Sequence, residues 1–520
     1  MISDDPVCLL RITEKDRVEL ERLVFKRYPD REWGTFFRFG YRITSWGVHA
    51  TFVELIEPFG DGLDPTSGIV EFKAAYILRA QLSLSDTPLG IGVIHSHPEG
   101  GGTGASSLDN DMDDYFAREF LLYGGLRPYL SLRISRAPDQ TFRFSGEAWH
   151  EGAVIPITEM LTVGCELSRE YAESCSLPQE NFARKSFEFT TRLASLIGYK
   201  VTRIQAATVG VIGCGGLGSP AIHILVRSGI RRFVLVDPDM FEPSNLERLH
   251  GSTRSDVGAS AYKVDILRRL IMSIAPDADV RTLVGNVLDG SVLDEILRCD
   301  IVLGCTDTQH SRAALGDYAT HYLLPCIDGA VLMRMKDGTL TEQVGEIARY
   351  TADDPCPWCM GRIDQRTLAY ELMSDSERQG RAEAAAQAVE RGLDGAQYWG
   401  DKPPVELTVG YMTTVVGAMQ AGYAETWLSG VATMPHHRFQ FDLGMPFLAV
   451  APDPRSRKQE CACNRTKGWS DQARDERSVA RPSHWPNDTR RSSGPMTDTR
   501  STVPRKVSFF QSIWRRFRGS

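Results

Sequence analysis

The sequence predicts an α/β protein with two folded domains, and three observations lead to this prediction. Residues 181–465 alternate short β-rich runs with helical stretches, which is typical of a doubly wound parallel sheet. Residues 1–150 mix short strand-like runs with a helical stretch near Glu14–Lys26, which favours a compact α+β domain. The end of the chain is basic and rich in Ser, Pro and Thr, which predicts disorder.

We therefore expect an N-terminal domain over 1–150, a linker over 151–180, a doubly wound domain over 181–465 and a disordered basic tail over 466–520. A chain of 520 residues is long enough for this organisation, at roughly 100–200 residues per domain. Within the tail, residues 507–518 interleave aromatic side chains with arginines. This pattern leaves open an unstructured segment, weak nucleic-acid binding, or an amphipathic contact with a membrane surface or a partner.

The composition excludes several classes of protein. It is 42% hydrophobic and 24% charged, as in ordinary globular proteins, and the net charge of −8 lacks the basic balance of a nucleic-acid-binding protein. No apolar run approaches the roughly 20 residues that a transmembrane helix needs, and the N-terminus has no secretory signal pattern. We therefore expect a cytoplasmic protein whose 11 cysteines are thiols or metal ligands.

A glycine-rich turn predicts a nucleotide site. Gly213, Gly215, Gly216 and Gly218 follow an apolar strand and precede a helical segment, so backbone N–H groups can approach a phosphate closely. A second strand ends at Asp237, where an acid contacts a ribose hydroxyl in dinucleotide folds. On these residues alone, a domain that binds NAD or FAD is an equally good interpretation.

Polar residues further along the chain favour adenylation. Attack of a carboxylate on the α-phosphate of ATP requires fixed cations and magnesium to neutralise the charge that develops. The chain supplies suitable side chains in order, namely Asp239, Asn245, Arg248, Lys263 and Asp307. Asp307 ends a further predicted strand, where its carboxylate could bind magnesium.

In this order, the motifs GxGGxG, DxD, NLxR, DVG, Lys and CTD resemble those of the ThiF/MoeB and ubiquitin-activating-enzyme family. The resemblance implies a Rossmann-like adenylation domain, with Asp237 on the ribose and Asp307 on magnesium. It implies phosphate-binding roles for Asn245, Arg248 and Lys263. Asn181-Phe-Ala-Arg184 resembles the segment whose arginine reaches the ATP of a partner subunit, so we expect Arg184 to act catalytically within a homodimer.

Two cysteine pairs predict a structural zinc site. Four thiolates in two close pairs can complete a tetrahedral site, and the pairs are Cys356 with Cys359 and Cys461 with Cys463. The family resemblance supports this prediction, although the family commonly has two CxxC pairs and the second pair here is CxC. No cysteine lies between 359 and 461, so we assign no cysteine that forms a thioester.

The N-terminal domain contains a second candidate metal site. His95 and His97 alternate on a predicted strand, so both side chains can face one metal ion, and Asp109 supplies a third ligand. A zinc ion held by three residues keeps a position for water and lowers its pKa to about 7. Ser106 is suitably placed to stabilise a developing oxyanion.

His-Ser-His-Pro followed by Ser-x-x-Asp resembles the JAMM (JAB/MPN) metalloisopeptidases, which hydrolyse amide bonds after ubiquitin-like C-termini. The spacing between the second histidine and the serine is one residue longer than usual in that family. The family also needs a glutamate as general base. Glu32, in Arg-Glu-Trp-Gly, fits best, and Glu54 is the alternative.

Together the two resemblances imply an enzyme with two active sites that uses ATP, magnesium and zinc. The N-terminal domain would process a ubiquitin-like protein or release it from conjugates, and the doubly wound domain would adenylate the C-terminal carboxylate of that protein. The product could pass to a conjugating enzyme, as in a bacterial antiviral conjugation system. Sulfur-carrier activation for cofactor synthesis, adenylation of a short peptide and a non-catalytic scaffold that binds a ubiquitin-like protein are the alternatives.

Overall fold

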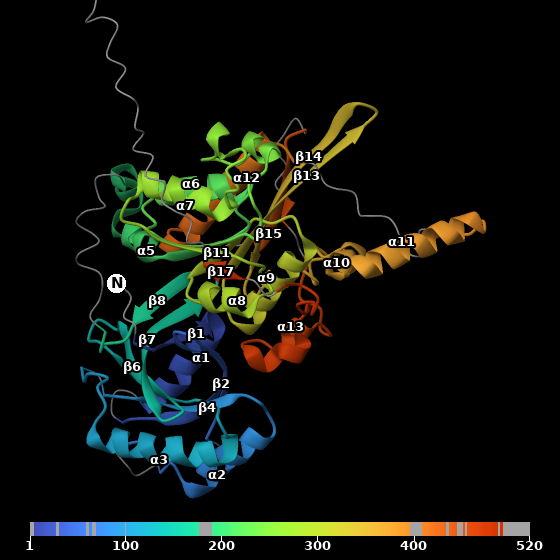
Figure 1. The fold of residues 1–520 in the computed structure, drawn as a ribbon. Coiled ribbons are helices and arrows are strands. Elements are labelled where there is room, and N and C mark those ends of the chain that lie inside the picture. Colours follow the sequence, from blue (N-terminus) through green and yellow to red (C-terminus); the bar gives the residue numbers. More distant parts are fainter. Residues whose placement is uncertain are drawn as a thin grey trace, which may run out of the picture.

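The computed structural model describes residues 5–27, 31–58, 62–64, 69–98, 100–175, 190–395, 408–432, 436–444, 451–452, 455–486 and 489–491. They form an N-terminal unit, residues 5–175, and a C-terminal unit, residues 190–491, each built around its own sheet. Figure 1 shows the N-terminal unit, in blue and cyan, below the C-terminal unit. None of the helices in the described ranges combines the length and apolar character that a membrane crossing requires.

The N-terminal unit is a strongly curved sheet with helices packed on both of its faces. Its elements are β1 (Val7–Thr13), α1 (Glu14–Val24), η1 (Phe25–Arg27), β2 (Gly34–Thr44), β3 (Gly47–Ile56), α2 (Ala74–Leu82), η2 (Ser83–Ser85), β4 (Gly90–Ser96), α3 (Ser107–Gly124), β5 (Tyr129–Arg136), β6 (Phe142–His150), β7 (Ala153–Val163) and β8 (Leu167–Tyr171). The strand order is β1-β3-β2-β4-β5-β6-β7-β8, and β1 also pairs with β7, so strands β1 to β7 form a closed ring.

Alternation along the strands divides the apolar side chains of this unit into two cores. Phe37 and Phe39 belong to one core with Leu130 and Leu132 of β5. Phe36, which points to the opposite face of β2, packs instead with aromatic residues of α2 and α3 such as Tyr76 and Phe116. The α2 and α3 helices therefore cover one outer face of the sheet (Figure 1).

The prediction of a linker over 151–180 is wrong for its described part. Strand β7 pairs with β6 and, along most of its length, with β1, and β8 pairs with β7. These residues therefore complete the N-terminal sheet. The prediction failed because β7 pairs with a strand about 150 residues earlier in the chain, and no local sequence pattern indicates such a pairing.

The C-terminal unit contains the predicted doubly wound sheet. Its elements are η3 (Gly198–Lys200), α5 (Val201–Ala206), β9 (Thr208–Ile212), α6 (Gly218–Arg227), β10 (Arg232–Val236), η4 (Pro243–Glu247), η5 (Arg254–Asp256), α7 (Lys263–Ile274), β11 (Asp279–Val284), α8 (Gly290–Ile296), β12 (Ile301–Gly304), α9 (Gln309–His321), β13 (Cys326–Lys336), β14 (Thr339–Tyr350), α10 (Gln365–Leu372), α11 (Asp375–Glu390), α12 (Gly410–Ser429), β15 (Arg438–Asp442), β16 (Ala451–Pro452), α13 (Ala462–Arg465), η7 (Asp471–Glu476) and β17 (Arg490–Arg491).

The order of this sheet is β16-β15-β14-β13-β12-β9-β10-β11-β17, and strands β9 to β13 run parallel. The chain moves outward from β9 to β11 and then returns to β12 on the other side of β9. This reversal creates a crevice at the carboxyl ends of β9 and β12, which is where doubly wound folds bind ligands. Helices α6, α7 and α12 cover one face, and α8 and α9 cover the other.

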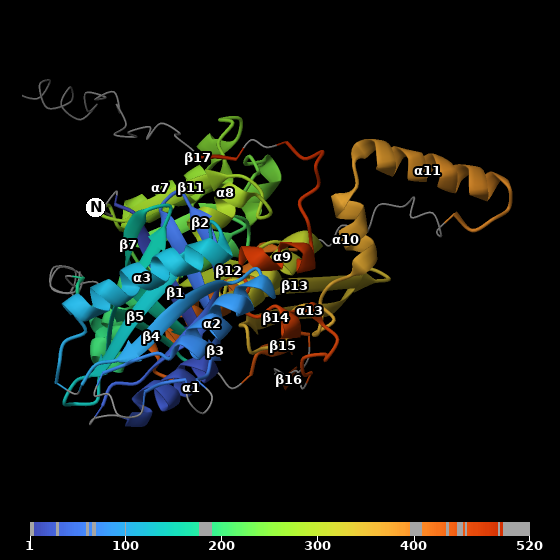
Figure 2. The same ribbon diagram turned by 90° about the horizontal axis from the view of Figure 1, so that it is seen from below.

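Helix α11 differs from the other long helices because it projects away from the body, as both views show (Figures 1 and 2). Ala388 is the only residue of α11 that is buried. Helix α10 precedes α11 with two residues between them, and residues 396–407 lie outside the described ranges.

The predicted disordered tail is ordered over 466–486 and 489–491. We call residues 455–486 and 489–491 the C-terminal strap. Gly468 accepts a hydrogen bond from Thr51 Oγ1 at 2.6 Å, and Ser470, fully buried, donates its N–H to His321 O. Residues 492–520, which include the aromatic and arginine-rich segment, lie outside the described ranges. The prediction from composition was wrong here because backbone hydrogen bonds and ion pairs, rather than the burial of apolar side chains, hold the strap in place.

The strap contacts both units. On the N-terminal unit, Gln472 Oε1 accepts the N–H of Tyr41 at 2.8 Å and Lys467 pairs with Asp16. On the C-terminal unit, the Asp317 carboxylate accepts the N–H of Ser478 at 2.9 Å. The strap therefore ties the two units together.

A buried arginine also joins the units. Arg11, on β1, donates to the carbonyl oxygens of Leu297 (2.9 Å) and Cys299 (2.7 Å) at the end of α8, and its Nη1 lies 3.0 Å from His49 Nε2. Burial lowers the pKa of Arg11 to about 10, so it stays charged at neutral pH. Trp46 adds a second junction by donating to Asp294 O at 2.7 Å.

We predict that Arg11→Ala lowers the free energy of unfolding by about 3 kcal/mol, because it leaves the buried carbonyl groups of Leu297 and Cys299 without this donor. Urea denaturation followed by tryptophan fluorescence measures this change. Arg22→Ala, which removes an exposed ion pair with Glu19, is the matched control and should change stability by less than about 0.5 kcal/mol. Equal effects of the two variants would contradict the proposed role of Arg11.

Candidate functional site

The glycine-rich turn after β9 is shaped by close backbone contacts. Gly213 has φ +97°, and a Cβ there would lie 2.6 Å from Cys305 O. A Cβ on Gly218 would lie 2.1 Å from Gly213 O. By contrast, a Cβ on Gly215 would meet no atom within 4 Å, so this residue faces open space. The turn therefore brings its backbone, with Gly215 facing open space, beside the N-terminus of α6, as a phosphate site requires.

Asp237, at the end of β10, braces this turn. Its carboxylate is 5% exposed and accepts the N–H groups of Cys214 (2.7 Å) and Asp239 (2.8 Å). Burial raises the pKa of Asp237, against the opposing effects of Lys263 and the two backbone donors. Both carboxylate oxygens of Asp237 thus accept hydrogen bonds from backbone N–H groups. The ribose contact expected for Asp237 stays a prediction.

Lys263 is the cation at the centre of the site. Its Nζ lies 2.7 Å from Asp239 Oδ2. Burial alone would lower the pKa of Lys263, but the carboxylates of Asp237, Asp239 and Asp307 raise it above the ordinary value. Asp307 is exposed at the carboxyl end of β12. One lysine and three carboxylates thus gather at the carboxyl ends of β9, β10 and β12, which is the donor set expected for a nucleotide with magnesium.

Arg248 lies on the other side of the turn. A Cβ on Gly216 would lie 3.1 Å from Arg248 Cδ, so the arginine stem packs against the glycine backbone. Arg248 Nη1 donates to Ser244 O at 3.1 Å, and the local turn is stabilised by Asn245 Oδ1, which accepts the N–H of Glu242 at 3.0 Å. Asn245 is buried and holds this turn, and its predicted phosphate contact is untested. Arg184 lies outside the described residues.

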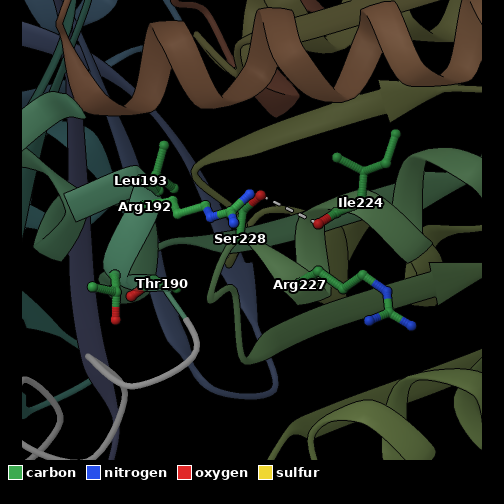
Figure 3. A pocket seen from close by; sticks show the side chains of 7 residues that line it. Thr190, Arg192, Leu193, Ile224, Arg227 and Ser228 are labelled. Carbon is green, nitrogen blue, oxygen red and sulfur yellow. Dashed lines mark hydrogen bonds between the residues drawn. The ribbon is translucent and has the colours of Figure 1, made fainter. Parts of the chain in front are cut away.

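A pocket of about 520 Å³ lies at the far end of α6 from the glycine turn (Figure 3). It is lined by Thr190, Thr191, Arg192, Leu193, Ile224, Arg227 and Ser228. Ser228 Oγ donates to Ile224 O there, which closes the C-terminal turn of α6. Of the predicted site residues that the structure describes, none lines this pocket, so it is separate from the nucleotide crevice.

The N-terminal unit brings His95, His97 and Asp109 together. The two Nε2 atoms are 3.1 Å apart, and Asp109 carboxylate oxygens lie 3.1 Å from His95 Nε2 and 3.7 Å from His97 Nε2. Two nitrogens bound tetrahedrally to zinc would be about 3.3 Å apart. His97 Nδ1 lies 3.0 Å from Gly102 O and donates to it, which leaves Nε2 free as a ligand. The three side chains therefore fit a zinc ion.

Ser106 and Asp109 begin helix α3 as a capping box. Ser106 Oγ accepts the Asp109 N–H, and Asp109 Oδ2 accepts the Ser106 N–H at 2.7 Å. Burial raises the pKa of Asp109, but His95 and the Ser106 backbone lower it more, so the carboxyl is held well below its ordinary range. The cap orients the carboxylate, and the oxyanion role of Ser106 is not tested by this geometry.

The two candidate general bases differ in position. Gly34 of β2 is opposite His95 of β4, and Ser96 donates its N–H to Trp33 O at 2.9 Å. Continuing this antiparallel register places Glu32 opposite His97 on the same face. Glu54 instead pairs with Arg38 at 2.5 Å, four residue pairs from His95 along β2. The geometry therefore favours Glu32.

Sequence reasoning missed the residues that hold the loop between Pro98 and Ser106. The carbonyl of the fully buried Thr103 accepts bonds from Arg133 Nε at 3.1 Å and from Ser145, while Thr103 N donates to Glu173 at 2.7 Å. Glu173 lies in the segment predicted as a linker, and Arg133 carries no motif. No local signal could have identified them.

The four predicted zinc thiols converge. Cys356 Sγ lies 3.7 Å from Cys461 Sγ, and Cys359 Sγ lies 3.8 Å from Cys463 Sγ, close to the ~3.8 Å between sulfurs around tetrahedral zinc. The hydrogen bond with Cys356 lowers the pKa of Cys463 to about 5, which favours its thiolate. The CxC pair therefore reaches the same point as the CxxC pair, and the cluster can hold zinc.

The other cysteines of the C-terminal unit lack the features of an acceptor for an acyl group. Cys214, Cys299, Cys305 and Cys326 are buried, and burial raises the pKa of each thiol. A buried thiol with a raised pKa is a poor nucleophile. This agrees with the absence of an assigned thioester cysteine among the described residues.

Comparisons with known proteins match the C-terminal unit. Residues 190–463 match the ThiF family. The SAMP-activating enzyme E1 of Haloferax volcanii is 28% identical over 158 residues, 30% of this chain and 54% of that protein. The adenylyltransferase and sulfurtransferase MOCS3 of Bos taurus is 31% identical over 179 residues, 33% of this chain and 38% of that protein. The chain thus spans about half or less of these relatives.

A solved structure, that of E. coli MccB, is 16% identical, covers 56% of this chain and 74% of its own, and has a TM-score of 0.39. That score adds nothing to the assignment. The family match lies wholly within the C-terminal unit and leaves residues 1–189 outside it, but it spans more than half of the chain. Together with the glycine turn, Lys263 and the carboxylates around it, this match establishes that the chain belongs to the ThiF family.

Proposed function

We propose that this protein uses ATP and magnesium to adenylate the C-terminal carboxylate of a ubiquitin-like protein. The observation that supports this most directly is the position of Lys263 among Asp237, Asp239 and Asp307 beside the glycine turn. A dehydrogenase needs no such cluster of charges at the phosphates. The names of the two relatives, which describe an activating enzyme and an adenylyltransferase, agree with this chemistry.

In the proposed reaction, a carboxylate oxygen forms a bond to the α-phosphorus and the bond from that phosphorus to the bridging oxygen breaks. Pyrophosphate leaves with the electron pair, and the product is an acyl-adenylate. Lys263 and Arg248 provide fixed positive charge on two sides of the glycine turn, where they stabilise the charge of the transition state. Asp307 would hold the magnesium that accompanies the phosphates.

Three further features are parts of this proposal. The protein acts as a cytoplasmic homodimer, with Arg184 reaching the partner subunit's ATP. The modifier passes from the acyl-adenylate to a conjugating enzyme, because the described C-terminal unit offers no exposed thiol apart from its metal cluster. Sulfur-carrier activation is the main alternative, and the MOCS3 relative favours it. Peptide adenylation and a scaffold are further alternatives that the assays below separate.

A second activity rests on a different observation. We propose that the N-terminal unit is a zinc isopeptidase of the JAMM type, because His95, His97 and Asp109 converge with the geometry of a three-residue zinc site. Bound zinc would supply an activated water. Glu32, opposite His97, would take the proton from that water and later deliver it to the leaving amine, and Ser106 would donate to the oxyanion.

The nucleotide site is tested by measuring ATP–pyrophosphate exchange in the presence of a mature ubiquitin-like protein that ends in glycine. Lys263→Ala and Asp307→Ala should each lower exchange by about 100-fold or more, because each removes charge that is fixed before the transition state forms. Lys336→Ala, at the exposed end of β13, is the control and should exchange at the wild-type rate. Exchange with a short peptide but not with the protein would instead favour peptide adenylation, and no exchange with either would favour a scaffold.

The isopeptidase prediction combines cleavage with metal analysis. His95→Ala should lose one zinc ion per chain and all cleavage of a ubiquitin-like C-terminal fusion, while pyrophosphate exchange is unchanged. Glu32→Gln should keep the zinc and lower cleavage by about 100-fold or more, since a general base contributes 10²–10⁴-fold. Glu54→Gln is the matched control and should cleave normally. Loss of cleavage in Glu54→Gln alone would contradict the assignment of the base.

The cysteine prediction concerns stability. Cys359→Ser should release one zinc ion per chain and lower the free energy of unfolding by about 3 kcal/mol or more, since a structural zinc contributes folding energy directly. Mass spectrometry of the native protein and thermal unfolding measure both changes. Cys165→Ser, at an exposed cysteine outside the cluster, is the control. A normal zinc content in Cys359→Ser would rule out the four-thiolate site.

A further inference from the structure

The C-terminal strap ends on the rim of the nucleotide crevice. Strand β17 pairs antiparallel with the last two residues of β11, Arg491 opposite Leu283 and Arg490 opposite Val284. Directly after β11, Thr489 packs so closely on Gly285 that a Cβ there would lie 2.6 Å from Thr489 Oγ1. The strap therefore covers the carboxyl end of β11, the strand that follows β10 outward from the glycine turn.

This rim adjoins the residues proposed to bind the nucleotide. Leu283 O, beside the strap, accepts the N–H of Asp237 at 3.2 Å. Arg490 donates to the hydroxyl of Tyr262, and its guanidinium carbon lies 5.4 Å from the centre of the Tyr262 ring. Tyr262 immediately precedes Lys263. The strap is therefore connected to the charged centre of the site in two ways. Leu283, its partner in β11, binds the backbone of Asp237, and Arg490 contacts Tyr262, the residue before Lys263.

The strap also contacts helix α9, which begins two residues after Asp307. Trp485 lies edge-on to His310, with ring centres 5.2 Å apart, and His310 is three residues after Asp307. Between these ends, Arg481 pairs with Asp289 and Thr489 Oγ1 donates to the same carboxylate. The described strap therefore follows the rim from the side of Asp307 to the side of Lys263.

The order of the strands indicates which part of the nucleotide would meet this rim. In a doubly wound fold the phosphates lie at the turn after the first strand and the ribose at the acid that ends the second strand. Here these are the turn after β9 and Asp237 at the end of β10. The base then lies one strand further out, at the end of β11, where Arg490 presents an exposed planar cation. A guanidinium stacks well on a flat aromatic face.

We propose that the strap forms the wall of the adenine subsite and that Arg490 is a binding residue for the base of ATP. This inference rests on the proposed adenylation function, because it takes the nucleotide to be ATP. Arg490 acts on affinity for the base and not on the phosphates. The adjacent Arg491 points to the other face of the strand, where it pairs with Glu295 of α8 at 2.6 Å.

Isothermal titration of the full chain with magnesium ATP and with inorganic tripolyphosphate tests this inference. Arg490→Ala should raise the Kd for ATP about 10-fold and leave the Kd for tripolyphosphate unchanged. The Kd of Arg490→Lys for ATP should lie between those of the wild type and Arg490→Ala. Arg491→Ala is the matched control, with wild-type affinity for both ligands. Thermal unfolding confirms that each variant is folded.

The outcomes separate this inference from the proposed function. An unchanged Kd for ATP in Arg490→Ala overturns the inference, and so does equal weakening of ATP and tripolyphosphate, which would make Arg490 a phosphate ligand. Failure of the wild-type protein to bind ATP overturns both. ATP binding that depends on Arg490, together with no pyrophosphate exchange for any acyl substrate, supports the inference and overturns the adenylation function alone.

Discussion

The relative position of the two units depends on a charge buried between them. Arg11 leaves water only because the carbonyl groups at the end of α8 and the imidazole of His49 receive its N–H groups. Burying an unpaired guanidinium would cost several kcal/mol, so these hydrogen bonds favour the docked position of the two units. Together with the strap, this contact joins the two units that carry the candidate sites.

Features set by short stretches of sequence could be predicted. The glycine turn, the strand before it and the acid at the end of β10 lie within about 30 residues, and the geometry of the turn follows from steric limits on Gly213 and Gly218. His95 and His97 share a face because of strand alternation. The cysteine pairs met as predicted, although CxC spacing differs from CxxC, because each pair supplies two thiols within one short turn.

Features set by distant partners could not be predicted. Strand β7 looked like linker because its partner β1 is at the other end of the unit. The part of the strap after residue 465 was predicted to be disordered because few of its side chains are apolar, yet Ser470 is fully buried and makes backbone hydrogen bonds. The sequence preferred Glu32 to Glu54 as the general base, and the register of β2 on β4 agrees with that preference, but the role of Glu32 stays a prediction.

Synthesis on the ribosome gives the strap a particular consequence. The N-terminal strands emerge first, but the carbonyl partners of Arg11 follow nearly 290 residues later, and the strap residues that hold Tyr41 and Thr51 follow more than 400 residues later. During that interval the nascent N-terminal unit has an uncovered polar and apolar face. We expect it to stay loosely packed until translation is nearly complete, so that a stalled or truncated chain is recognised as unfinished by chaperones and proteases.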